Sequence, residues 1–134
     1  MNMVIYGEGT AADPWVLKTP PGSSEFHAWI DGEVLQVAVG KTKLGYQRRG
    51  IEDCLAMLKE RGDWVELGNA DEGKPVKEGS VEAWARDESN PVGGYYGVRK
   101  GYRGRFANYV TPVMELMGLV ELEHKARGNR VRAV

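Results

Sequence analysis

The sequence has few of the side chains that usually bind metals or form covalent cross-links. Its 134 residues include one cysteine and two histidines. A single cysteine excludes an intramolecular disulfide and a cysteine-based metal cluster. His27 and His124 lie far apart in the chain, and no carboxylate spacing suggests a metal site. We therefore expect neither a metal nor a cofactor.

Long apolar runs and phosphate-binding fingerprints are also missing. No stretch approaches 18 consecutive apolar residues, and the opening Met-Asn-Met-Val-Ile-Tyr is too short and uncharged for a signal peptide. Neither GxGxxG nor GxxxxGK followed by Ser or Thr occurs. We expect a cytoplasmic protein that does not contact a membrane. The length and the apolar content of 42% predict one domain, or one domain with a small appendage.

Residues 1–47 are expected to form an irregular arm followed by a small antiparallel sheet. The first 24 residues are rich in Gly, Pro, Ser and Thr, with one short extended piece at residues 15–18. Trp15 and Leu17 in that piece are expected to fasten the arm to the body. Asp31-Gly32 then separates two apolar stretches and predicts a hairpin. The following KTKLGYQ is a candidate third strand.

Residues 48–134 change to helical periodicity. IEDCLAMLKERG has apolar residues at helical spacing, acids early, bases late and Gly62 as its stop, which predicts a helix. DWVELG predicts a short strand, and Ser80 can cap a second helix, VEAWARD. A glycine-rich connection follows at residues 90–104. The chain then continues into a third helix and two short strands, LVELEH and NRVRAV, with a turn at Gly128-Asn129.

The third helix is predicted to have one buried face and one exposed face. Its apolar residues recur at spacings of four, three and four, namely Phe106, Val110, Val113 and Met117. Polar residues collect on the opposite side, namely Arg105, Asn108, Thr111 and Glu115. We expect this polar side to meet solvent or a partner.

Pro112 leaves two alternatives open for this helix. In a single helix that begins near Gly104, Pro112 lies in the interior, removes a backbone donor and kinks the helix. In the other alternative, Thr111 caps a second, short helix that has Pro112 at its first position.

Two resemblances follow from these segments. The order helix, strand, helix, glycine-rich connection, helix and basic hairpin resembles that of winged-helix domains. The fold class is therefore predicted to be α+β, with a small N-terminal antiparallel β-sheet joined to a C-terminal winged-helix-like portion of three helices and a β-hairpin wing. The segments DPWVLKTPPGSSEF, RGDWVELGNADE, VEAWARD, NPVGGYYG and GRFANYV are similar to those of a family of small, uncharacterised bacterial proteins. That likeness implies a bacterial context and supplies no catalytic residues.

Charge is distributed unevenly along the chain. From Tyr95 onward, eight basic and three acidic residues give a net charge of +5, whereas residues 1–94 carry −6. In a winged helix, the basic residues before the last helix and in the hairpin would flank a face that enters a DNA groove. The predicted nucleic-acid-binding residues are Arg99, Lys100, Arg103, Arg105, Asn108, Lys125, Arg127 and Arg130. Tyr95, Tyr96 and Tyr102 are candidates for stacking on bases.

Two other functions stay open. A protein-interaction module would expose an apolar patch involving Trp29 or Trp84. An enzyme would need a concave pocket with convergent polar groups near residues 93–100. Spacing singles out no catalytic set, and Cys54 reads as a core residue because it lies at the inner margin of a helix. Catalysis is therefore the least favoured of the three.

Overall fold

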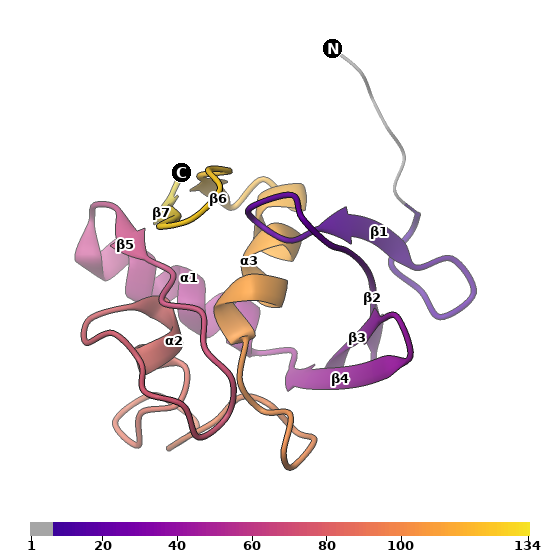
Figure 1. Ribbon diagram of the computed structural model, residues 1–134, viewed down its shortest axis with the longest axis horizontal. Helices are drawn as coiled ribbons and strands as arrows, with labels where there is room; N and C mark the ends of the chain where they lie inside the picture. The colour runs from indigo at the N-terminus through magenta and orange to yellow at the C-terminus, as the bar shows by residue number, and fades with distance from the viewer. Residues whose placement is uncertain (1–6) are drawn as a thin grey trace.

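The computed structural model describes residues 7–134, which form a mixed α+β structure built around one central helix (Figure 1). Ten elements follow one another along the described chain: β1 (Trp15–Lys18), β2 (Glu25–Asp31), β3 (Val34–Val39), β4 (Thr42–Gln47), α1 (Gly50–Arg61), β5 (Val65–Glu66), α2 (Val81–Trp84), α3 (Phe106–Leu116), β6 (Val120–Leu122) and β7 (Arg130–Ala133). None of the helices in residues 7–134 is both long enough and apolar enough to cross a membrane.

The first four strands form an antiparallel sheet in the order β1-β2-β3-β4. The predicted turn at Gly32 is confirmed, because Asp31 pairs with Val34 across it and Gly32 has φ 60°. The predicted extended piece at residues 15–18 is strand β1, where Trp15 pairs with Ala28. One face of this sheet is buried against α3. Phe26, Leu35 and other apolar side chains lie on this buried face of the sheet.

The remaining strands form a second antiparallel sheet in the order β5-β7-β6. Val131 is buried at the centre of β7 and pairs with Val65 on one side and Leu122 on the other. Both predicted strands of the hairpin are present but shorter than the sequence segments suggest. Strand β5 has only two residues, and the pairing continues one residue further through the Leu67 N–H to the Asn129 carbonyl (3.0 Å).

Helix α1 confirms the signals read from its sequence. Glu52 and Asp53 lie in its first turn, and Lys59 and Arg61 lie in its last. Gly62 ends the helix in a left-handed conformation (φ 68°), and its N–H bonds to the Leu58 carbonyl (3.0 Å).

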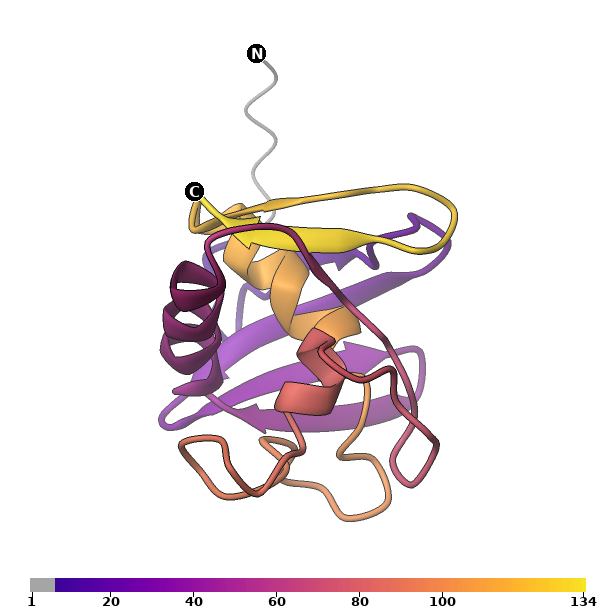
Figure 2. The same cartoon turned by 90° about the vertical axis from the view of Figure 1, so that its left-hand side faces the viewer.

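Helix α3 departs from the amphipathic prediction, because every residue from Phe106 to Met114 is buried. The predicted polar face is therefore wrong at Asn108 and Thr111, which are 8% and 0% exposed. The four-stranded sheet packs on one side of α3, while the second sheet, α1 and α2 pack around the rest (Figures 1 and 2). A helix enclosed on all sides cannot keep a solvated polar stripe, so Thr111 bonds internally to the Ala107 carbonyl.

Pro112 lies inside one continuous helix, so the alternative with a second short helix capped by Thr111 is not observed. Proline has no backbone N–H, and the Asn108 carbonyl therefore lacks the donor that it would normally meet four residues later.

A buried carboxylate caps the start of α3. Glu82 of α2 accepts hydrogen bonds from the backbone N–H groups of Ala107 (2.9 Å) and Phe106 (3.3 Å). It also accepts one from Nη2 of Arg86 (3.0 Å). The same Nη2 bonds the Ala70 carbonyl, and Nη1 bonds the carbonyls of residues 71 and 74. Burial raises the pKa of Glu82, while the Ala107 N–H and Arg86 act in the opposite direction. This network substitutes for a side-chain cap on Arg105 and ties α2, α3 and the loop after β5 together.

Candidate nucleic-acid interface

Seven of the eight predicted nucleic-acid-binding residues fall into two clusters, one in the loop before α3 and one in the β6–β7 hairpin, and Asn108 lies within α3. The loop cluster, Arg99, Lys100, Arg103 and Arg105, precedes the first turn of the helix. The hairpin cluster, Lys125, Arg127 and Arg130, lies between β6 and β7 or at the start of β7. Both ribbon views place the connection before α3 at the bottom of the molecule and the β6–β7 hairpin at the top (Figures 1 and 2). The two clusters therefore do not form one continuous basic face.

Acidic side chains neutralise half of the loop cluster. Arg103 makes a bidentate pair with Glu72, with Nε and Nη2 at 2.9 and 3.0 Å from the carboxylate oxygens. Arg105 Nε donates to Asp71. The pKa of Glu72 falls to about 2, chiefly through its hydrogen bonds with Arg103. Both acids come from the negatively charged first part of the chain, so the +5 charge read from the sequence is not a free surface charge.

The rest of the loop cluster is more open. The Arg99 guanidinium lies 4.3 Å from the centre of the Tyr102 ring and donates to the Lys43 carbonyl. Lys100 is exposed and has no acidic partner in the part of the chain that the structure describes.

All three predicted stacking tyrosines contact protein side chains. Tyr96 is fully buried and stacks on Trp84, with ring centres 5.2 Å apart. The Tyr95 ring lies between the guanidinium groups of Arg86 (5.1 Å) and Arg103 (4.6 Å). Tyr102 is 46% exposed and has the Arg99 guanidinium over one face of its ring. The prediction that Tyr96 can stack on a base is wrong because that ring belongs to the core.

Acidic side chains also neutralise part of the hairpin cluster. Arg130 makes a bidentate pair with Glu123 (2.9 and 2.8 Å), and Lys125 lies 3.5 Å from the same carboxylate. Hydrogen bonds from Arg130 lower the pKa of Glu123 to about 2. Arg127, at the tip, is exposed and has no acidic partner among residues 7–134.

A groove of about 510 Å³ lies beneath the tip of this hairpin. Its walls are the tip itself (residues 126–129), the turn at Pro20-Pro21 and the segment from Glu66 to Lys77. Asn108 of α3 contributes to the lining and is only 8% exposed. Its side-chain amide has no hydrogen-bond partner within residues 7–134, whereas Asn129 bonds the Lys125 backbone twice. The sequence predicts Asn108 on an exposed helix face, whereas the structure places it in the lining of this groove.

The side chains considered for catalysis or metal binding do not converge. Cys54 is fully buried, and burial raises the pKa of its thiol to about 12, which confirms it as a core residue. His124 bridges Glu115 (2.6 Å) and the Pro20 carbonyl (2.9 Å). Residues 7–134 hold no group of three His, Cys, Asp or Glu side chains arranged for a metal ion.

The expected tryptophan patch is also absent from the described surface. Trp29 and Trp84 are both half-buried, and Trp84 packs against the core. The exposed large apolar side chains are instead scattered at Val98, Tyr102, Leu116, Met117 and Val134.

A family model described as a family of unknown function (DUF6855) matches residues 7–134. The chain belongs to this family. The match confirms the expected membership of an uncharacterised family and assigns no role to any residue. No curated protein and no solved structure matches the chain.

Proposed function

We propose that this protein is a binding module without catalytic chemistry, and that it holds an extended segment of a partner protein in the groove beneath the β6–β7 hairpin. The observation that carries the proposal is the Asn108 amide. The Asn108 residue is only 8% exposed and lines the groove, and its amide has no hydrogen-bond partner among the described residues. The amide atoms are still open to solvent, so a ligand in the groove can reach them and form a hydrogen bond in a largely desolvated position.

The lining of the groove favours a peptide over a nucleobase. An asparagine amide can pair in bidentate fashion with a peptide group or with adenine, so Asn108 alone does not decide. Recognition of an unstacked base normally uses an aromatic ring, and the groove lining contains none. Its prolines Pro20, Pro21 and Pro75 instead offer apolar surface without a backbone N–H, which suits the side chains of an extended segment.

The charged side chains of the groove indicate which peptides it would prefer. Lys77 at the rim is paired with Glu66, whereas Arg127 is free to bind a carboxylate. We therefore expect an acidic side chain near the residue whose backbone meets Asn108.

The arrangement of residues 50–133 supports a winged-helix-like module. The elements follow the order helix, strand, helix, helix and hairpin, and the first strand pairs beside the last one. In DNA-binding winged helices the third helix enters the major groove, which requires an exposed face. Since α3 is buried from Phe106 to Met114, this module is better suited to bind a partner beside the helix than to insert the helix itself.

An array of random-sequence synthetic peptides, probed with labelled protein, tests the proposal. Bound peptides should be enriched in Asp or Glu, and their affinity should fall roughly tenfold with Asn108→Ala, because one bidentate contact is lost. Arg127→Gln should weaken the same peptides, while Lys100→Gln, the matched loss of an exposed charge in the loop before α3, should not. Peptides that bind all three variants equally would refute the groove as the site.

Nucleic-acid binding is the second candidate, favoured by the free charges of Arg99, Lys100 and Arg127. Fluorescence anisotropy of labelled duplex and single-stranded oligonucleotides at about 50 and about 200 mM salt measures it. Binding that weakens steeply with salt and disappears when the three side chains are neutralised together would favour this candidate over the peptide groove. Absence of binding at the lower salt would eliminate it.

A further inference from the structure

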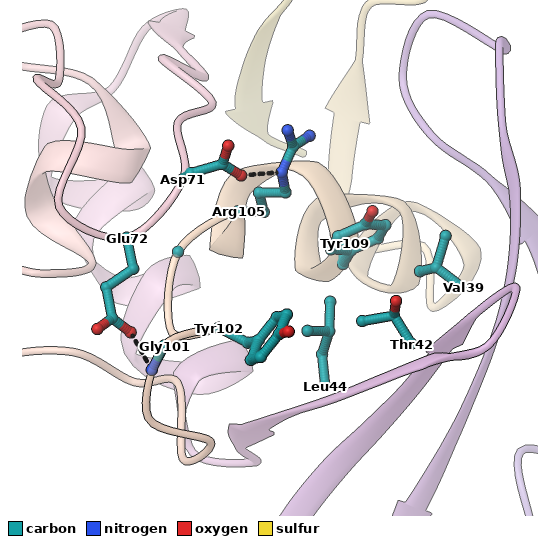
Figure 3. A pocket seen from close by; sticks show the side chains of 10 residues that line it. Val39, Thr42, Leu44, Asp71, Glu72, Gly101, Tyr102, Arg105 and Tyr109 are labelled. Atoms are coloured by element: carbon teal, nitrogen blue, oxygen red, sulfur yellow. Dashed lines mark hydrogen bonds and ion pairs between the residues drawn. The ribbon is translucent and has the colours of Figure 1, made fainter.

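A second hollow, the arginine pocket, is lined by different residues from the hairpin groove. It has a volume of about 470 Å³. Figure 3 shows Arg105 and Asp71 at one side of it, Tyr102 beside Leu44, and Tyr109, Thr42 and Val39 across from the arginine. The lining thus comes from the β3–β4 hairpin, the first turn of α3, the loop before it and the segment after β5. An enzyme would need a pocket near residues 93–100, and the arginine pocket lies just beyond that stretch, at Gly101 and Tyr102. No signal in the sequence indicates the contribution of Asp71, Glu72 and Tyr109.

Polar groups without protein partners meet in this pocket. Arg105 uses its Nε to bond Asp71, and no partner within residues 7–134 occupies its two Nη groups. Tyr109 is only 6% exposed, yet its hydroxyl has no hydrogen-bond partner among the described residues. Thr42 adds a second free hydroxyl. A guanidinium fork with neighbouring hydroxyl donors is a typical receptor for a planar oxyanion.

The backbone holds Arg105 in an unusual conformation. It is the one non-glycine residue in 7–134 with a positive φ (62°), and its N–H bonds the Ala70 carbonyl (2.9 Å). Gly104 just before it packs so closely on the Asp71–Glu72 backbone that a Cβ would lie 2.4 Å from the Glu72 nitrogen. Strained residues of this kind persist where the surrounding structure fixes them, often at ligand sites.

The charges around the pocket distinguish between oxyanions. Asp71 and Glu72 are balanced by Arg105 and Arg103, so the local net charge is zero. The hydrogen bond from Arg105 holds the pKa of Asp71 below its usual range, and both acids stay ionised at neutral pH. A dianionic phosphate would therefore face two carboxylates, whereas a monoanionic carboxylate needs only the free side of one guanidinium.

The remaining lining supplies apolar contact. Leu44 is 7% exposed, Val39 packs against the core, and the Tyr102 ring is open to solvent. Apolar walls around a few convergent polar groups are typical of small-molecule sites.

We propose that the arginine pocket binds a small organic carboxylate with an aromatic or apolar body. The carboxylate lies on the Nη groups of Arg105 and accepts a hydrogen bond from the Tyr109 hydroxyl. The body lies against Leu44 and Val39 and beneath the Tyr102 ring. This site shares no lining residue with the hairpin groove and stands or falls independently of it.

Ligand-observed NMR with three matched probes tests this proposal: phenylacetate, its neutral analogue phenylacetamide, and phenyl phosphate. Phenylacetate should bind with a dissociation constant of about 1 mM or below, and the other two should bind more weakly. Tighter binding of phenyl phosphate, or no binding of phenylacetate, would overturn the assignment.

Two variants locate the site on the protein. Arg105→Asn removes the guanidinium but tolerates the left-handed backbone, so the fold should persist while phenylacetate binding falls at least about tenfold. Tyr109→Phe removes one hydroxyl and should weaken binding roughly fivefold. Arg48→Gln, at an exposed arginine that lines neither hollow, is the matched control and should leave phenylacetate binding unchanged. Unchanged binding by Arg105→Asn, with a native backbone spectrum, would also overturn the proposal.

Discussion

The two ends of α3 are both held by charged side chains, but these side chains differ in their exposure to water. At the first turn, the side chains of Glu82 and Arg86 are 1% and 11% exposed, and they bond backbone groups as well as each other. At the last turn, Glu115 and His124 are 38% and 48% exposed. The two ion pairs should therefore contribute very differently to the free energy of unfolding. Water screens the exposed pair, whereas removing one partner of the buried pair leaves an uncompensated buried charge.

The largest expected effect is at the buried end. Glu82→Ala leaves the Arg86 guanidinium without a counter-charge and two N–H groups of α3 without an acceptor. We expect a loss of about 3–5 kcal/mol in the free energy of unfolding, measured by urea denaturation. Glu82→Gln keeps an acceptor and should lose less. A loss below about 1 kcal/mol for the alanine variant would show that the network does not hold α3 in place.

A smaller loss of stability is expected on substitution of Tyr46. This residue lies in the four-stranded sheet, and its side chain contacts the backbone just before the first turn of α3. Its hydroxyl donates to the Gly104 carbonyl (2.7 Å) in a fully buried position. Tyr46→Phe should cost about 1–2 kcal/mol, because the carbonyl is left unpaired. Tyr102→Phe, which removes a hydroxyl at an exposed position, is the control and should leave the urea midpoint nearly unchanged. Equal effects of the two substitutions would contradict a structural role for the buried bond.

The contrast between the two ends also explains what the sequence could predict. Helix α1 and the turn at Gly32 depend on signals within a few residues, namely helical spacing, the stop at Gly62 and the Asp-Gly pair. Such signals are local, so the sequence was sufficient. The sequence also shows that the loop before α3 is basic. It does not show which acidic residues pair with these basic side chains in the folded protein.

The errors concern contacts between distant parts of the chain. Arg103 and Arg105 meet acids more than thirty residues earlier, and no local pattern indicates such pairing. The polar side of α3 was predicted to be exposed because an amphipathic stripe usually marks one packed face. Here polar Asn108 and Thr111 are enclosed, so the same pattern marks a groove-lining amide and an internal hydrogen bond.

The His124–Glu115 pair at the last turn of α3 is expected to contribute to the free energy of unfolding in a pH-dependent way. Burial lowers the pKa of His124, but the Glu115 carboxylate and the Pro20 carbonyl outweigh burial and raise it above its usual 6.5. A raised pKa in the folded state means that the stabilisation is fully present below the unfolded pKa and is lost as pH rises through the folded pKa. Wild type should therefore lose stability relative to His124→Gln between about pH 5.5 and about pH 8, by less than about 1 kcal/mol.

Urea denaturation of both proteins at the two pH values measures this change, and Glu115→Gln should remove most of it. A gain in relative stability with rising pH would contradict the His124–Glu115 pair as described.

The smallest effect is expected on the outer surface of the β6–β7 hairpin. Arg132 bonds Glu121 through Nε and Nη2 (3.2 and 3.1 Å), with the side chains 41% and 52% exposed. A double-mutant cycle of Arg132→Gln and Glu121→Gln should give a coupling of about 0.5 kcal/mol or less, and it should shrink at high salt. Arg132 also lies 4.5 Å from the centre of the Trp64 ring. Substitution of Arg132 alone should therefore lower the free energy of unfolding more than substitution of Glu121 alone. A coupling as large as that of the buried Glu82–Arg86 pair would mean that exposure to water does not set the strength of these ion pairs.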